Sequence, residues 1–217
     1  MTLQETQNPS FPFAMKRSPA LLALTLSAAL LSAPLARAAA CCHAPVPEHE
    51  AAAFSEKSLY QLDATWTDDR GNTLSLGSLQ GRPVVLAMVF ANCSYACPIL
   101  VNDMQRLRAA LPDEVRERAQ FVLVSFDHER DTPAALAAYR ERVGLDPEYW
   151  TLLHGEPENI QELAMLLGIK FRRTPAGDYA HSNVITILNE QGEIVHQRPG
   201  LQGEVATAAK ALTLVSR

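Results

Sequence analysis

Two cysteines separated by three residues, the second followed by a proline, are the residues of this chain best suited to chemistry. They are Cys93 and Cys97, with Pro98 next in the sequence. Two thiolates at this spacing can form and exchange a disulfide, or can bind one soft metal ion such as Cu(I). The motif alone leaves both kinds of chemistry open.

The segments before and after this motif predict a buried strand and a helix. The run 84–90 is entirely apolar, as in a strand that is buried on both faces. From Pro98 to Leu111, leucines and a methionine recur at helical spacing, and proline suits a first helical turn. Cys97 should therefore lie at a helix N-terminus, where the dipole favours thiolate over thiol. Cys93 should lie in the loop between the strand and the helix.

The rest of the chain alternates between strands and helices and ends in a hairpin and a helix. This order predicts an α/β fold, a thioredoxin-like sandwich with a central mixed sheet and flanking helices. A generic α/β domain with a structural disulfide is the alternative, but a cross-link that closes so short a loop would add little stability. Strands are expected at 120–126 and 151–153, hairpins at 62–76 and 184–197, and helices at 133–144, 160–168 and 204–214.

Residues 1–38 have the pattern of a secretory signal peptide. Two basic residues precede the apolar stretch 21–31, and Ala36-Arg37-Ala38 is typical of a cleavage site. Met15 is an alternative start, because the residues before it contribute nothing to a signal. The apolar stretch is short for a membrane span, which favours cleavage. We therefore expect an exported protein, in a compartment where disulfides can form.

The segment 39–57, rich in Pro, Ala and Glu, is expected to be a flexible leader, and 58–217 the folded domain. The leader contains Cys41, Cys42 and His43, which allow three interpretations. They are a second metal-binding segment, a remnant of the signal, or a lipid attachment point at Cys41 that would tether the protein to the membrane.

The charge of the mature chain is negative. The signal contains three of the 19 basic and one of the 24 acidic residues, which leaves 16 basic and 23 acidic residues and a net charge of −7. Such a balance argues against nucleic acid and against an anionic membrane surface as partners.

A histidine downstream favours metal binding over disulfide exchange. His181 lies just before the strand expected at 184–188, where thioredoxin-like oxidoreductases have a cis-proline that packs against the disulfide. The nearest proline here is Pro175, which is too far back for that role. A single histidine is usually a solvated or hydrogen-bonded residue, but this one is placed to complete a site of two thiolates and an imidazole. Such a site suits Cu(I) and can hold Cu(II).

A third motif completes a resemblance. Residues 127–133, Asp-His-Glu-Arg-Asp-Thr-Pro, follow the Cys-x-x-x-Cys-Pro motif and precede His181, and with them the chain resembles the Sco/SenC family. The similarity extends from about Ser58 to about Gly200. The resemblance implies a periplasmic copper chaperone with a thioredoxin-like fold, in which Cys93, Cys97 and His181 are the copper ligands.

The resemblance also implies partners. Such proteins help to assemble the dinuclear copper site of cytochrome c oxidase by delivering copper, by reducing the cysteines of the target, or both. The expected partners are the copper-site subunit of that oxidase, or another copper enzyme, and a thioredoxin-like reductant.

Asp127 matches a family aspartate that ends a core strand near the site. The resemblance implies that it supports the site without binding the metal, by orienting a ligand or tuning the redox potential. Two other positions depart from the family pattern. His128 stands where a proline is usual, which implies either an altered loop or an extra ligand. Ala180 stands where an aspartate is common, so that His181 lacks a carboxylate partner at that position.

Two other functions compete with this interpretation. The first is a thiol–disulfide oxidoreductase that acts on exported proteins, with Cys93 or Cys97 as nucleophile. The second, a peroxidase, fits less well, because the residues before Cys93 lack the threonine of peroxidatic loops. Two further histidines, His154 and His196, are interpreted as a structural and a solvated residue.

Overall fold

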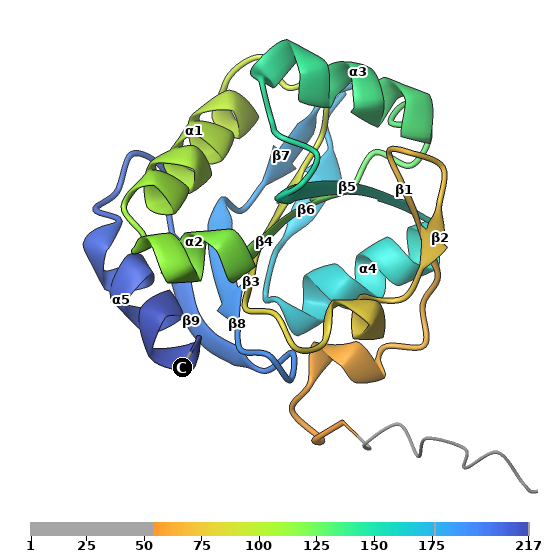
Figure 1. Ribbon diagram of the computed structural model, residues 1–217. Coiled ribbons are helices and arrows are strands. Elements are labelled where there is room, and N and C mark those ends of the chain that lie inside the picture. The colour runs from red at the N-terminus through yellow and green to blue at the C-terminus, as the bar shows by residue number, and fades with distance from the viewer. Residues whose placement is uncertain (1–53, 176, 217) are drawn as a thin grey trace, which may run out of the picture. The chain divides into compact units, whose positions relative to one another are not determined.

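A seven-stranded sheet is the centre of the computed structural model, which describes residues 54–175 and 177–216 (Figure 1). Its strand order is β2-β1-β5-β4-β3-β8-β9. The β3, β4 and β5 strands run parallel, whereas β1, β8 and β9 pair antiparallel to their neighbours. The predicted mixed sheet is therefore confirmed. Its strands are β1 (Trp66–Asp68), β2 (Thr73–Leu74), β3 (Val84–Val89), β4 (Gln120–Ser125), β5 (Trp150–Gly155), β8 (Val184–Leu188) and β9 (Ile194–Pro199).

Helices pack on both sides of this sheet. In Figure 1, α1 and α5 lie together on one side and α4 lies on the other. The α3 helix packs against β5. The helices are α1 (Ala96–Ala109), α2 (Asp113–Arg118), α3 (Pro133–Val143), α4 (Pro157–Leu166) and α5 (Ala206–Val215), with 3-10 turns at Leu59–Gln61 and Leu76–Leu79.

The ends of α3 follow from local sequence, as predicted. The Thr132 hydroxyl accepts a hydrogen bond from the backbone N–H of Ala135, and Pro133 occupies the first helical position. Gly144 ends the helix in the left-handed conformation, with φ of 65°. The α1 helix begins at Ala96, two residues before the predicted start, so that Pro98 still lies in the first turn.

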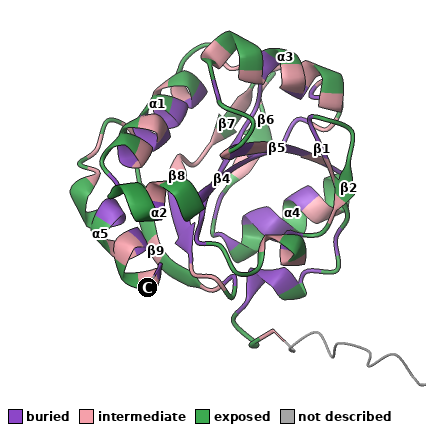
Figure 2. Cartoon of the chain, in the orientation of Figure 1, coloured by how far each residue is buried: buried purple, intermediate pink, exposed green. Residues whose placement is uncertain are grey.

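The core consists of the central strands and the helix faces that pack on them. Every residue of β3 and β4 is buried, which explains why β3 and the middle of β4 (121–124) are apolar without alternation. Figure 2 shows the same contrast, with buried strands and exposed outer faces on the helices. The ligand-bearing loop therefore starts from a rigid, fully packed strand.

Three local predictions need correction. The strand expected from residue 62 begins only at Trp66, because the preceding residues form a 3-10 turn and its exit. The α2 helix was not predicted. Neither was a separate two-stranded sheet formed by β6 (Phe171–Arg173) and β7 (Tyr179–His181), which interrupts the path from α4 to β8.

The predicted signal peptide, most of the predicted leader, and Cys41, Cys42 and His43 lie outside the described residues. Within residues 54–175 and 177–216, none of the helices has the length and apolar character needed to span a bilayer.

Candidate metal centre

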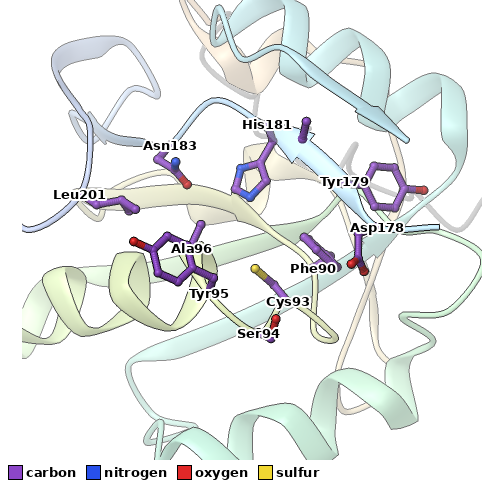
Figure 3. Close-up of a pocket in the computed structure, with 11 residues that line it drawn as sticks. Phe90, Cys93, Ser94, Tyr95, Ala96, Asp178, Tyr179, His181, Asn183 and Leu201 are labelled. Carbon is purple, nitrogen blue, oxygen red and sulfur yellow. The ribbon is translucent and has the colours of Figure 1, made fainter. Parts of the chain in front are cut away.

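The three predicted ligands come from three different elements and meet at one place. Cys93 lies in the loop after β3, Cys97 in the first turn of α1, and His181 at the end of β7. One donor atom from each lies within 4.8 Å of the others. The Cys97 sulfur is 3.7 Å from Nε2 of His181, and Figure 3 shows the Cys93 sulfur directed toward the same imidazole. Both cysteines are free thiols.

The two thiols differ in ionisation. The pKa of Cys93 is lowered to about 5, because it accepts a hydrogen bond from the Cys97 thiol and from backbone N–H groups of the first helical turn. One of these is the Cys97 N–H, which lies 3.3 Å from the Cys93 sulfur. The pKa of Cys97 is raised, first because its proton is held by Cys93 and then by burial. The expectation that the helix favours the Cys97 thiolate is therefore wrong for the metal-free protein, since the N–H groups of α1 point toward Cys93.

The tautomer of His181 follows from its second nitrogen. Nδ1 lies 3.0 Å from the carbonyl oxygen of Ser182, which can only accept a hydrogen bond. Nδ1 therefore carries the proton, and the lone pair of Nε2 faces the thiols. A backbone carbonyl thus performs the orienting role that a carboxylate at position 180 would have performed.

Aromatic side chains pack around the imidazole of His181. The ring of Phe126 lies 4.9 Å from that of His181, and Phe90 lies edge-on at 6.1 Å. Phe171 and Tyr179 pack in turn against Phe126, at 5.3 and 5.1 Å. These four residues, called here the aromatic shell, restrict rotation of the imidazole. Sequence reasoning missed them because they come from four separate segments.

Asp127 is fully buried just after β4 but has no hydrogen bond to the three predicted ligands. Its carboxylate pairs with Arg130, whose guanidinium lies 5.9 Å from the centre of the Tyr179 ring. The other carboxylate oxygen is buried without a partner among the described residues. Asp127 is therefore connected to the predicted ligands only indirectly, by way of Arg130 and the aromatic shell. His128 does not join the group of donor atoms.

Asp131 holds the cysteine loop in place, a role that the sequence did not indicate. Its carboxylate accepts hydrogen bonds from the N–H of Ala91 at 2.8 Å and from the Ser125 hydroxyl at 2.5 Å. Burial raises the pKa of Asp131. Its backbone carbonyl bonds Nδ1 of His154 at 3.0 Å, which confirms a structural role for that histidine. The turn at 127–133 thus ties β4 and β5 to the loop that carries Cys93.

A cavity of about 400 Å³ opens beside Cys93 and His181. In Figure 3, Tyr95 and Leu201 line it on one side and Phe90 on the other. The Tyr95 side chain is 75% exposed. Cys97 does not line this cavity, because it is fully buried. A molecule that enters the cavity therefore meets Cys93 and His181 first.

The loop that contains Leu201 is fastened to α1 by a buried ion pair. Asp103 accepts a hydrogen bond from Arg198 at 2.6 Å and from the N–H of Gln202 at 2.7 Å. Both charged side chains are at least nine-tenths buried. These contacts therefore hold the loop that carries Leu201 against the helix that carries Cys97.

Comparisons with known proteins agree with this geometry. The family model described as SCO1/SenC matches residues 53–216. A Stutzerimonas stutzeri protein whose name assigns it copper binding is 33% identical over 147 residues, which cover 64% of this chain and 68% of that protein.

Solved structures support the fold. The structure of Bradyrhizobium japonicum ScoI with copper bound has a TM-score of 0.57 at 23% identity and covers 70% of this chain and 96% of that one. BsSco, described as having a disulfide switch and as a member of the Sco family of cytochrome c oxidase assembly proteins, has a TM-score of 0.62 at 22% identity. That match covers 72% of this chain and 94% of BsSco. The predicted thioredoxin-like sandwich is confirmed.

Proposed function

Because this chain belongs to the SCO1/SenC family, we propose that Cys93, Cys97 and His181 bind one copper ion and that the chain is a copper chaperone. The observation that carries the proposal is the position of two sulfurs and one imidazole nitrogen within 4.8 Å of one another. Two soft sulfur donors with an imidazole match the preference of Cu(I) and can also hold Cu(II).

The protonation of the three donor residues suits the binding of a copper ion. Cys93 is a thiolate at neutral pH, because its pKa is about 5. In the neutral imidazole of His181, Nδ1 donates to the Ser182 carbonyl, which leaves Nε2 as the nitrogen that can bind a metal ion. Only Cys97 must lose its proton when a metal ion binds, so uptake should release about one proton at neutral pH.

The open cavity indicates how copper leaves. Cys93 and His181 line it, whereas Cys97 is buried behind them. A client's donor atoms reach the copper from the side of Cys93 and His181, and the ion passes by stepwise exchange of ligands. Cys97, the least accessible ligand, is the last to release it.

We place this activity in the periplasm, on the basis of the signal-like pattern of residues 1–38. The proposed clients are the copper-site subunit of cytochrome c oxidase or another copper enzyme, and a thioredoxin-like protein is the proposed reductant. The description of BsSco as a member of a family of oxidase assembly proteins supports this choice of client.

A second function, thiol–disulfide exchange, is favoured by the low pKa of the half-buried Cys93. The Cys93 thiolate would attack a client disulfide and form a mixed disulfide, with one client thiolate as leaving group. Cys97 would then lose its proton and attack Cys93, which releases the second client thiol and leaves a Cys93–Cys97 disulfide. The two electrons gained by the client come from the two cysteines, and a dithiol reductant must restore them.

Copper titration of the reduced full chain tests the proposal. We expect one Cu(I) per chain, and loss of this site in Cys93→Ser and Cys97→Ser. The double variant Cys41→Ser/Cys42→Ser is the matched control, because it removes two thiols outside the site. If the control loses the site and Cys93→Ser keeps it, copper binds at the leader and the proposal is wrong.

His181→Ala separates the two functions, with His196→Ala as its control. A copper chaperone should bind copper more weakly without His181 and still form its disulfide. An oxidoreductase should change its exchange rate, with no effect on copper. Oxidation to the disulfide removes both thiolate ligands, so an oxidised chain that binds copper as tightly as the reduced one would also contradict the site.

A further inference from the structure

The small sheet that carries His181 has two chemically different faces. Phe171 pairs opposite His181, and Arg173 pairs opposite Tyr179. Residues directly opposite in an antiparallel pair lie on the same face. This face turns its rings toward the metal centre, where Phe171, Tyr179 and His181 contact Phe126.

The other face combines two cations with two small residues. Arg172 pairs opposite Ala180. Lys170 lies opposite Ser182, with two hydrogen bonds between them at 2.8 and 3.2 Å. Long side chains on one strand beside short ones on the other leave a hollow, and a cavity of about 340 Å³ is lined by these four residues together with Phe171 and His181. We call the surface formed by Lys170, Arg172, Ala180 and Ser182 the basic trough.

The positive charge of the basic trough is not neutralised within the described part of the chain. Lys170 and Arg172 are exposed, and neither has an ion-pair partner there, whereas Arg173 on the opposite face pairs with Glu129 at 2.7 Å. No acidic side chain of the described residues lines this cavity. Like charges two residues apart on one strand face repel each other, and an anion between them would relieve this repulsion.

The trough adjoins the metal centre through His181, which lines both cavities. A partner whose donor atoms reach Cys93 and His181 therefore comes close to the trough and to the exposed Tyr95. In a chain with a net charge of −5, this local positive charge selects an acidic surface.

We propose that the basic trough binds carboxylate side chains of an acidic segment of the protein that exchanges copper with this site. This inference rests on the proposed function for the identity of the partner, but the binding itself needs no metal. Charge complementarity beside the site would speed encounter and align the partner's donor atoms with Cys93 and His181.

The experiment uses the reduced, metal-free full chain labelled with ¹⁵N, titrated with an acetylated hexaglutamate peptide. We expect amide shifts confined to residues 168–183 and the adjoining cavity. Binding should be lost at about 0.5 M NaCl, where the screening length is only about 4 Å. A hexalysine peptide should cause no such shifts.

Two charge-matched variants locate the binding. Lys170→Glu/Arg172→Glu should weaken hexaglutamate binding at least tenfold, whereas Lys57→Glu/Lys210→Glu, with the same change in net charge at exposed lysines elsewhere, should weaken it less than threefold. Equal weakening in both would overturn the proposal, because the effect would then be one of net charge. If Lys170→Glu/Arg172→Glu changes the amide spectrum outside residues 168–183, Lys170→Gln/Arg172→Gln provides the same test with a smaller change in charge. Unchanged hexaglutamate affinity in that neutral variant would also overturn the proposal.

Two other probes test the choice of a protein partner. Citrate that binds the trough as tightly as the peptide would make it a small-anion site. Phosphatidylglycerol vesicles that bind through Lys170 and Arg172 while the peptide does not would make it a membrane contact. Either result overturns the proposal. A chain that binds the peptide but no copper would instead refute the proposed function, so the two failures are distinguishable.

Discussion

Alkylation of Cys93 at different pH values measures the hydrogen bonding at the metal centre. The chain carrying Cys41→Ser/Cys42→Ser should be treated with iodoacetamide, and the modified peptide that contains Cys93 quantified by mass spectrometry. Cys97 should react slowly, because it is fully buried and its pKa is raised. The measured rate therefore belongs to Cys93.

The magnitude follows from the pKa of Cys93, about 5 in place of the ordinary value of 9.0. At pH 7 this change raises the thiolate fraction from about 1% to about 99%. The intrinsic reactivity of a thiolate falls with its pKa, by roughly 40- to 100-fold over this range. The two effects nearly cancel at pH 7, so the rate there is uninformative. The shape of the profile decides: we expect a flat rate between about pH 6 and 8, where an ordinary thiol gains about tenfold per pH unit.

The variant Cys97→Ala then tests the cause of the low pKa of Cys93. The Cys97 thiol is the largest contributor to the low pKa, and backbone N–H groups supply the rest. The variant should move the midpoint of the profile upward, to a value between 5 and 9.0. A rate that rises tenfold per pH unit in the parent chain would refute the thiolate assignment. An unchanged midpoint in Cys97→Ala would refute the role of the Cys97 thiol.

Four further predictions concern the surroundings of the site. Asp127→Ala should keep one-to-one copper binding and weaken it roughly 10- to 100-fold; unchanged affinity with lower stability would leave Asp127 a structural residue. Phe126→Leu should weaken copper binding without moving the Cys93 titration, and an unaltered affinity would contradict the orienting role of the aromatic shell. The pKa of Asp131 is raised, so the folded state holds its proton to higher pH than the unfolded state does, and stability falls as pH rises through that window. Asp131→Asn should remove this slope in urea unfolding measured from acidic to neutral pH, and a persisting slope would locate its cause elsewhere. Asp103→Asn leaves Arg198 buried and charged without its partner, which should cost about 3–5 kcal/mol in urea unfolding; a loss below about 1 kcal/mol would show that the pair contributes little.

Local sequence signals were sufficient for the elements that carry the cysteines. The apolar run of β3, the proline in the first turn of α1 and the capping residues of α3 each depend on a few adjacent residues, and all were confirmed. The β6–β7 sheet was missed because each strand has only three residues. Neither strand shows a periodicity long enough to identify it.

The types and order of Cys93, Cys97 and His181 in the chain were enough to predict them as a group, and the fold brings their donor atoms together. The sequence did not predict which of the two thiols is ionised, because that depends on where the N–H groups of α1 point. Helix position alone favoured Cys97, whereas the folded loop places the Cys93 sulfur in front of those groups.

The surroundings of the site were decided only by tertiary structure. The aromatic shell joins Phe90, Phe126, Phe171 and Tyr179 from separate segments, and Asp131 bonds a residue 40 positions away. The two faces of the β6–β7 sheet depend on one pairing, Phe171 opposite His181. A shift of one residue in that register would exchange aromatic and basic side chains between the faces, because side chains alternate along a strand. The sequence determines which residues alternate, and the packing of Phe171 against Phe126 determines which of them face the metal centre.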